Sequence, residues 1–326
     1  MADFTKKTHR TSYPAISPTS PSNSHAERTV LITGGTGGIG LATAHSFVRA
    51  GAARIIITGR RPDILSNAVK ELEAGSSTSK SVVIGKTLDL ASTPSIQQLW
   101  WELRNENVEI DTLILNAGML EHHSILGDFA TTIAMYTTNV LQNLQMADRF
   151  IKQFSPPSPS SSTDRKQKTL LFIASVESSI MPTIPGHGAY AATKAAAASM
   201  LQTLAFERPV SELKILNIHP GAVLTEAARA NGFTEDSLSW DAPELPGDFC
   251  VWACGEQAGF LHGRFVHAAW DVEELVERKG EIEGDEAVLR IGIEGSRGMG
   301  MEAFMEGLVK KGKEEGKVAE QEGGGS

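Results

Sequence analysis

The chain has 326 residues, of which 41% are hydrophobic and 21% charged, with a formal net charge of −9. This length allows one large domain or two small ones, the acidic balance argues against a nucleic-acid partner, and no apolar run approaches the roughly 18 residues of a membrane span. Two cysteines, Cys250 and Cys254, are too few for a structural zinc site, so we expect no metal centre, a reduced pair and a cytoplasmic protein.

Residues 1–27 are dense in Ser, Thr and Pro and show no apolar periodicity, which predicts a disordered tail. Lys6, Lys7 and Arg10 with little acid also fit a transit peptide, but the polar Ser/Pro content favours the plain tail. One domain is expected over residues 28–297, followed by a solvated tail over 298–326.

Glycines dominate the turn after the first predicted strand. Residues 29–33 have the apolar character of a buried strand, residues 34–40 read Gly-Gly-Thr-Gly-Gly-Ile-Gly, and a helix over 41–50 and a strand over 54–58 follow. In such a βαβ unit glycines let the backbone approach a pyrophosphate, and the helix N-terminus offers free N–H groups. The turn therefore predicts a dinucleotide site; the alternative is a tight turn without a ligand.

The glycines fit two registers. G-x-G-x-x-G begins at Gly35, and G-x-x-x-G-x-G uses Gly34, Gly38 and Gly40. No Gly-Lys-Ser/Thr follows, which argues against a phosphate-loop nucleotidase.

The second strand ends in Thr58-Gly59-Arg60-Arg61, without the carboxylate that usually binds a ribose 2′-hydroxyl. Arg60, with Arg61 behind it, can instead pair a 2′-phosphate, which favours NADP over NAD. The alternative is a solvated arginine pair.

The remaining elements alternate between strand and helix, the pattern of a parallel doubly wound sheet. Strands are expected over 81–87, 111–115, 169–174, 214–218 and 263–271, and helices over 96–104, 128–154 and from 271 to 279, with a short extension over 287–293. Residues 155–168 are a low-complexity mobile insert, and 226–259 are expected to form a substrate lid.

Tyr190 and Lys194 lie four residues apart at the start of a strongly helical run, so they share one helix face. A nearby ammonium lowers a phenol pKa; a change from ~10 to about 7 corresponds to roughly 4 kcal/mol and would suit proton transfer at neutral pH. The pair alone also fits a solvated helix face.

Together these motifs resemble the classical short-chain dehydrogenase/reductase family from about residue 29 to residue 225. The motifs that carry the resemblance, in family order, are Thr33 to Gly40, Asp89, Asn116-Ala117-Gly118, Asn139, Ser175, Tyr190 with Lys194, and Pro220 to Thr225. The resemblance implies a Rossmann-type, doubly wound, seven-stranded parallel sheet with helices on both faces.

The resemblance also implies roles for four catalytic residues. Tyr190 is the general acid or base, Lys194 lowers its pKa and holds the nicotinamide ribose, Ser175 binds the substrate oxygen, and Asn139 holds a water that links Lys194 to solvent. Ser178 and Ser179 compete for the serine role, because the following loop is slightly long, although the strand end favours Ser175.

The implied cofactor contacts come from six stretches of the chain. They are Thr33, Gly34, Thr36, Gly38, Ile39, Gly40, Arg60, Asp89, Leu90, Asn116, Ala117, Gly118, Tyr190, Lys194, Pro220, Gly221, Val223 and Thr225. For Asp89 the alternative is the start of a turn.

The end of the chain resembles a subgroup common in filamentous fungi, which suggests secondary metabolism. Apolar residues near the predicted site suggest a medium-sized apolar substrate, with core packing as the alternative. These residues are Met119, Leu120, Met181, Ile184, Phe233, Leu238, Trp240, Leu245 and Phe249.

The expected function is therefore an NADP(H)-dependent oxidoreductase that interconverts a carbonyl and a secondary alcohol. A cofactor-binding sensor or scaffold without turnover, and a lyase or epimerase that uses the cofactor transiently, are the alternatives. The resemblance and the alanine-rich run after Tyr190 imply a homodimer or homotetramer formed through the Asn139 and Tyr190 helices, with no nucleic-acid or membrane partner.

Overall fold

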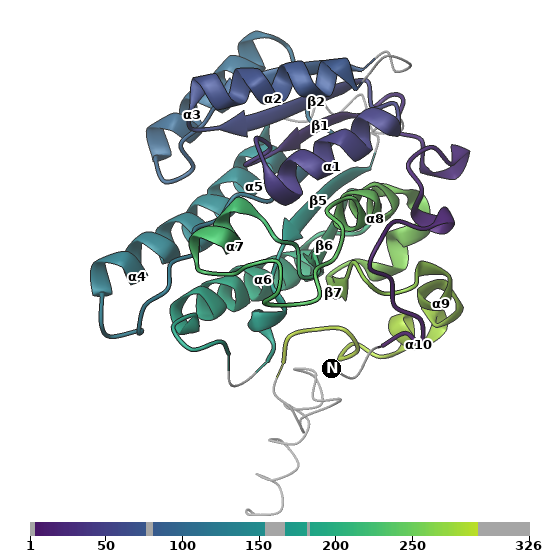
Figure 1. The fold of residues 1–326 in the computed structure, drawn as a ribbon. Coiled ribbons are helices and arrows are strands. Elements are labelled where there is room, and N and C mark those ends of the chain that lie inside the picture. Colours follow the sequence, from purple (N-terminus) through teal and green to yellow (C-terminus); the bar gives the residue numbers. More distant parts are fainter. Residues whose placement is uncertain (1–3, 76–80, 154–166, 181–182, 293–326) are drawn as a thin grey trace, which may run out of the picture.

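The computed structural model describes residues 4–75, 81–153, 167–180 and 183–292. Its centre is one parallel sheet of seven strands in the order β3-β2-β1-β4-β5-β6-β7 (Figure 1). The predicted doubly wound sheet is confirmed. The strands are β1 (Thr29–Ile32), β2 (Arg54–Gly59), β3 (Val82–Thr87), β4 (Thr112–Leu115), β5 (Lys168–Ile173), β6 (Leu213–His219) and β7 (Arg264–His267).

Helices cover both faces of the sheet because side chains alternate along the central strands. On β1, Val30 and Ile32 join one apolar cluster and Leu31 joins the other. Helices α1 (Gly38–Arg49), α2 (Pro62–Ala74) and α8 (Glu244–Cys254) contribute to the first cluster, and α3 (Thr93–Asn105), α5 (Asn143–Lys152) and α6 (Gly188–Glu207) to the second. The shorter helices are α4 (Phe129–Tyr136), α7 (Glu226–Ala230), α9 (Val272–Glu277) and α10 (Lys279–Gly284).

The long helix predicted over 128–154 is present but is not uniform. Asp128 caps α4 through the Thr131 N–H, and the π-helical segment Thr137–Gln142 joins α4 to α5. Such π turns often mark functional sites, and this one carries Asn139.

The prediction of a disordered N-terminal tail is wrong from residue 4 onward. This segment crosses the surface beside α8 and α9 (Figure 1), with Ile16 fully buried and the His9 N–H bonded to the Ala269 carbonyl at 2.7 Å. Tyr13 stacks on His9, and its hydroxyl donates to the Trp270 carbonyl. An extended strap has no apolar periodicity, so its sequence resembles disorder although it packs.

At the other end of the domain, β7 and α9 match the predicted strand and helix, and Asp271 caps α9. The expected extension over 287–293 has no regular structure as far as residue 292, but the Phe265 N–H bonds the Leu289 carbonyl there. The predicted insert over 155–168 lies outside the described residues as far as 166, and Lys168 at its end already begins β5. The predicted tail over 298–326 lies outside the described residues.

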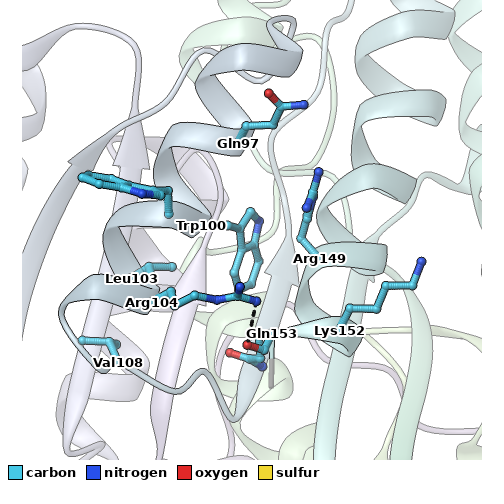
Figure 2. Close-up of a pocket in the computed structure, with 9 residues that line it drawn as sticks. Gln97, Trp100, Leu103, Arg104, Val108, Arg149, Lys152 and Gln153 are labelled. Carbon is cyan, nitrogen blue, oxygen red and sulfur yellow. Dashed lines mark hydrogen bonds between the residues drawn. The ribbon is translucent and has the colours of Figure 1, made fainter. Parts of the chain in front are cut away.

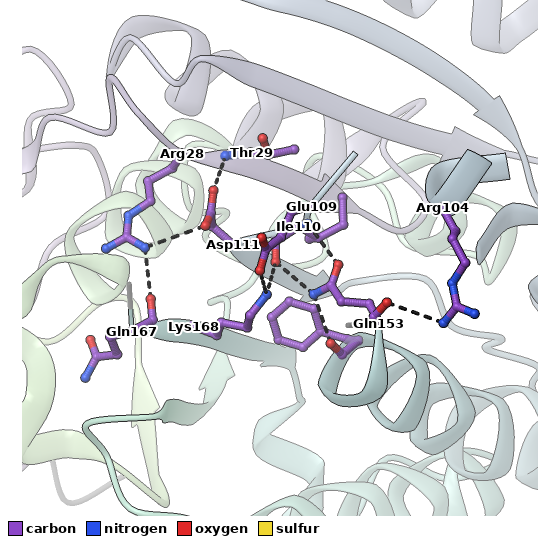
Figure 3. Close-up of polar contacts among 10 residues, drawn as sticks. Arg28, Thr29, Arg104, Glu109, Ile110, Asp111, Gln153, Gln167 and Lys168 are labelled. Atoms are coloured by element: carbon purple, nitrogen blue, oxygen red, sulfur yellow. Dashed lines mark hydrogen bonds and ion pairs between the residues drawn. The ribbon is translucent and has the colours of Figure 1, made fainter. Parts of the chain in front are cut away.

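Polar contacts close the amino-terminal edge of the sheet (Figure 3). The Thr29 N–H donates to Asp111 Oδ2 at 2.8 Å, and the Gln153 amide exchanges two hydrogen bonds of 2.9 Å with the backbone of Ile110. The opposite edge, where the strands end at their carboxyl termini, carries the residues described next.

Within the described residues, no helix is long and apolar enough to cross a membrane. Cys250 and Cys254 are buried on α8 as free thiols, and burial raises the pKa of Cys254 to about 12.

Candidate active site

The glycine-rich turn lies between β1 and α1. Gly34 has φ +65° and Gly38 has φ +52°, conformations that favour glycine. A Cβ on Gly40 would overlap the Gly34 carbonyl, whereas Gly37, which precedes α1, has open space around it. The turn is therefore packed tightly on the protein side and open on the outer side.

The predicted Asn116-Ala117-Gly118 stretch is bonded directly to this turn. Thr33 Oγ1 accepts hydrogen bonds from the N–H groups of Asn116 and Ala117, both at 3.0 Å. The Asn116 amide donates to the carbonyls of Thr33 at 2.9 Å and Gly34 at 3.1 Å. These hydrogen bonds link the residues that follow β1 to the residues that follow β4, beneath the candidate dinucleotide site.

The adenine side of the predicted site lies at the ends of β2 and β3. Arg60 is exposed and follows Gly59. A Cβ on Gly59 would contact the methyl group of Thr36 in the glycine-rich turn, so Arg60 lies next to this turn at the carboxyl ends of the strands. Asp89 is exposed, and its carboxylate accepts the Ala91 N–H, which makes it a turn residue as well as a candidate ligand. Leu90 is buried in the core, so only its backbone can face a cofactor.

The catalytic candidates meet at the ends of β4 and β5 and the start of α6. Lys194 is 3% exposed; its Nζ donates to the Ile173 carbonyl at 2.7 Å and lies 5.9 Å from the Tyr190 ring centroid. Ser175 follows β5 and shares a side-chain hydrogen bond with Tyr190. Ser179 is exposed and donates to the Val176 carbonyl, and Ser178 is buried with no hydrogen-bond partner for its Oγ among the described residues. The assignment of the serine role to Ser175 stays a prediction.

Burial shifts the pKa values of both members of this pair. Desolvation lowers the pKa of Lys194 to about 8. It also raises the pKa of the Tyr190 phenol above its usual range, as does the charge of Glu177, while the bond with Ser175 acts in the opposite direction. The net direction for Tyr190 is thus upward, opposite to the predicted value of about 7. That the Lys194 charge favours the phenolate stays a prediction.

Asn139 is fully buried, and its side chain is bonded to protein atoms. Its Oδ1 accepts the Met119 N–H at 2.7 Å, and its Nδ2 donates to the Met119 carbonyl at 2.8 Å and to Thr193 Oγ1 at 2.9 Å. Gly118 lies between this amide and Lys194, since a Cβ at Gly118 would stand 3.2 Å from Asn139 Oδ1 and 3.4 Å from Lys194 Nζ. Asn139 therefore positions the loop beside Lys194; the relay water stays a prediction.

The Pro220–Thr225 stretch closes the other side of the site. Thr225 lies against the glycine turn, 3.1 Å from the Cβ position of Gly38, and its Oγ1 caps α7 by accepting the Ala228 N–H. The Val223 carbonyl accepts the Thr225 N–H, and Gly221 has φ +91°. The glycine turn, the Asn116 stretch and this loop thus border one another.

The residues present fit a dinucleotide. The turn has glycines at positions where a Cβ would fill the space for a bound phosphate, and the space around Gly37 is open. The N-terminus of the twelve-residue helix α1 faces this space. Arg60 adds an exposed cation at the edge that the ribose of the adenosine half would occupy.

Sequence reasoning missed a buried carboxylate–imidazole pair beside Tyr190. Glu177 accepts from the Thr183 hydroxyl and contacts His187 Nδ1 at 3.2 Å; both side chains are buried. The His187 ring packs edge-on against Tyr190 and Phe233, with centroids 6.2 and 6.3 Å apart. Glu177 and His187 are ten residues apart in the loop between Ser175 and Tyr190, a spacing that matches no recognisable motif.

The predicted apolar pocket is wrong for two residues. Leu245 and Phe249 are fully buried on the core side of α8, against α1. The Phe233 ring packs against His187, which contacts Tyr190, so Phe233 does lie near the site. The Trp240 ring packs edge-on against Phe233. Leu238 and Ile184 are exposed, and Met181 lies outside the described residues.

A separate cavity of about 380 Å³ lies between α3 and α5 (Figure 2). Its lining includes Trp100 and Arg104 from α3 and Arg149 and Gln153 from α5. The C-terminal ends of these helices lie at the amino-terminal edge of the sheet, opposite Tyr190. We therefore place no part of the reaction there.

Comparison with known proteins agrees with this geometry. Residues 28–236 match the family model of short chain dehydrogenases. The chain is 32% identical over 276 residues to the short chain dehydrogenase/reductase nsrO of Aspergillus novofumigatus, covering 82% of this chain and 88% of the relative.

Two solved structures share the fold. The Pseudomonas aeruginosa RhlG/NADP active-site complex aligns with a TM-score of 0.65 at 22% identity, covering 76% of this chain and 96% of that one. A 7α-hydroxysteroid dehydrogenase complexed with NADH and 7-oxo glycochenodeoxycholic acid aligns with a TM-score of 0.66 at 18% identity, covering 79% and 97%.

Proposed function

The chain belongs to the short-chain dehydrogenase/reductase family and is an NAD(P)-dependent oxidoreductase, and from this premise we propose that it uses NADP(H) to interconvert a carbonyl and a secondary alcohol on an apolar small molecule. The observation that carries the proposal is the meeting of Tyr190, Lys194 and Ser175 beside the glycine-rich turn. The family and its fungal members are those that the sequence predicted.

In carbonyl reduction, Tyr190 Oη donates a proton to the substrate oxygen. Ser175 Oγ already accepts the Glu177 N–H at 3.2 Å, so its own hydrogen can be donated to the same oxygen. A bound nicotinamide supplies the hydride in this direction and accepts it in the other. In carbonyl reduction the protein thus supplies the proton, and the cofactor would supply the hydride.

Lys194 supplies a positive charge 5.9 Å from the centroid of the Tyr190 ring. Because its pKa is about 8, the ammonium persists at neutral pH, and because the pKa of Tyr190 is raised, the phenol stays protonated. The free protein is therefore set to donate a proton. Alcohol oxidation needs the phenolate, which the Lys194 charge stabilises.

We expect Arg60→Ala to weaken NADPH binding about 10- to 100-fold, because a charge-assisted bond to a phosphate contributes roughly 1.5–3 kcal/mol. NADH lacks the 2′-phosphate, so its affinity should change less than about twofold. Nicotinamide fluorescence titrations of both cofactors measure this. Arg229→Ala, on the lid helix α7, is the matched control. Equal losses for both cofactors would remove Arg60 from its proposed role.

The substrate side of the site combines apolar and polar groups. Phe233 and Trp240 offer an aromatic wall near Tyr190, and the Glu177–His187 pair offers one polar position. This composition supports a medium-sized apolar carbonyl compound with a single further polar group. Screening matched apolar and highly charged ketones tests it; preference for the charged members would contradict it.

We also propose a homodimer or homotetramer built on α4, the π segment and α6. Phe129, Ile133, Leu141, Met200 and Phe206 are large apolar side chains between 44% and 69% exposed on these contacting helices. Light scattering after size exclusion should give a multiple of the chain mass, and Leu141→Glu with Phe206→Glu should shift it toward monomer. A monomeric wild type would contradict this part of the proposal.

The sequence-based suggestions of secondary metabolism and of a cytoplasmic location remain part of the proposal. The metabolite profile of a deletion strain and the position of a fluorescent fusion test them; an unchanged profile or a membrane-bound fusion would count against them.

A further inference from the structure

The N-terminal strap, defined here as residues 4–16, reaches the candidate active site through one side chain. Thr8 forms an antiparallel bridge with Trp270, and the Ala242 N–H donates to the Arg10 carbonyl at 2.8 Å. The backbone of Arg10 is therefore held between the segment after β7 and the segment before α8.

The Arg10 side chain bonds the end of the lid. Its Nε donates to Asp241 Oδ1 at 3.1 Å, and its Nη2 donates to the Ser239 carbonyl. The Asp241 side chain is 10% exposed, so its charge is largely removed from water. Arg10 is the cation that balances it.

Asp241 in turn holds the loop at the nicotinamide end of the site. Its Oδ2 accepts the Ala222 N–H at 2.8 Å, and its own N–H donates to the Ala222 carbonyl at 2.6 Å. Gly221, at φ +91°, has its Cβ position 2.5 Å from Asp241 Oδ2, so any side chain there would displace the carboxylate. The contacts run without a break from Arg10 to Gly221.

Other strap contacts fix its position independently of Arg10. His9 Nε2 lies 2.8 Å from Asp271 Oδ2, and Ser12 Oγ donates to Asp248 Oδ2 at 2.6 Å. Asp248 Oδ1 accepts from Ser46 and Arg49 of α1, the helix that follows the glycine turn. Loss of the Arg10 side chain alone should therefore leave the strap in place.

We propose that Arg10 is a positioning residue that fixes the Pro220–Thr225 loop through Asp241 and so sets the affinity for the nicotinamide half of the cofactor. The proposal rests on the proposed NADP(H) function. Without Arg10, an unbalanced carboxylate stands beside the loop, which raises the cost of seating a negatively charged dinucleotide there and loosens the loop. The adenosine half, bound at the β2 end, should not respond.

The test compares two ligands on the full-length protein. NADPH spans both halves, whereas adenosine 2′,5′-bisphosphate carries the adenosine half alone. We expect Arg10→Ala to weaken NADPH about 3- to 10-fold and to leave the bisphosphate within about twofold, a range typical of mutations that act through a network. Lys6→Ala, which removes a charge from the same strap, should change neither, and Arg10→Lys should restore part of the NADPH affinity.

Two results would overturn the proposal. One is NADPH binding by Arg10→Ala equal to that of Lys6→Ala, and the other is equal weakening of both ligands, which would indicate a general structural effect. Arg10→Gln, which keeps a donor toward Ser239, replaces Arg10→Ala if the melting temperature of that variant falls. If the wild-type protein binds neither NADPH nor the bisphosphate, the proposed function itself is refuted. If the wild-type protein binds both ligands and Arg10→Ala binds NADPH equally well, only this inference is refuted.

Discussion

Tyr190→Phe should lower kcat about 10²- to 10⁴-fold while NADPH affinity stays within about twofold. The substitution removes one oxygen, the atom that donates the proton to the substrate, and general acid–base catalysis contributes a factor of this size. The ring remains to pack against His187. Steady-state kinetics with a carbonyl substrate and a fluorescence titration give the two values.

Tyr136→Phe is the matched control, because it removes the same atom from a partly exposed tyrosine on α4. It should change kcat less than twofold. A Tyr190→Phe variant that kept more than half of the wild-type kcat would show that the phenol is not the proton donor. Loss of cofactor binding as well would mean that the substitution disturbs the site as a whole.

Lys194→Met should lower kcat about 10²- to 10³-fold without a matching loss of stability. The lost ammonium no longer stabilises charge developing on Tyr190. Burying this charge, with its pKa at about 8, costs about 3 kcal/mol at neutral pH, and the lost bond to the Ile173 carbonyl costs about 1–3 kcal/mol. These terms oppose each other, so the Tm should move by less than about 4 °C.

The pH dependence has a defined sign. The folded pKa of Lys194 lies below the unfolded value of ~10.4, so the unfolded chain binds more protons between about pH 8 and ~10.4, and the free energy of unfolding rises with pH in that window. Wild-type kcat/KM for NADPH in carbonyl reduction should fall as pH passes about 8, because the ammonium is lost. Lys194→Met should lack this limb.

Lys214→Met is the control for burial. The pKa of Lys214 is also about 8 through desolvation, and its Nζ bonds the Gly255 carbonyl at 2.6 Å, away from Tyr190. It should alter stability and its pH dependence but leave kcat unchanged. Equal losses of kcat in the two variants would contradict the special role of Lys194.

The sheet was predictable because its signals are local. β1, β4 and β6 are short apolar runs followed by recognisable turns, and Asp271 precedes α9 as a helix cap should. The N-terminal strap was not predictable, since contacts such as those between His9 and Asp271 join residues 262 positions apart. The local hydrophobic periodicity of a sequence does not reveal contacts between residues so far apart.

The candidate site divides in the same way. Ser175, Tyr190 and Lys194 were found from motif spacing, and the fold brings them together at one edge. The direction of the Tyr190 pKa was missed because it depends on burial and on Glu177, neither of which spacing encodes. Asp241 was missed for the same reason, since its importance lies in its contacts with Arg10 and Ala222, which spacing does not encode.

The most direct test is whether purified protein converts carbonyl compounds at the expense of NADPH. Wild type incubated with a panel of apolar ketones should oxidise one NADPH for each secondary alcohol formed, with NADH a poorer donor and Tyr190→Phe inactive. Tight NADPH binding with no oxidation across the panel, or product formation without net NADPH consumption, would contradict the account and favour a cofactor-binding sensor or a lyase or epimerase.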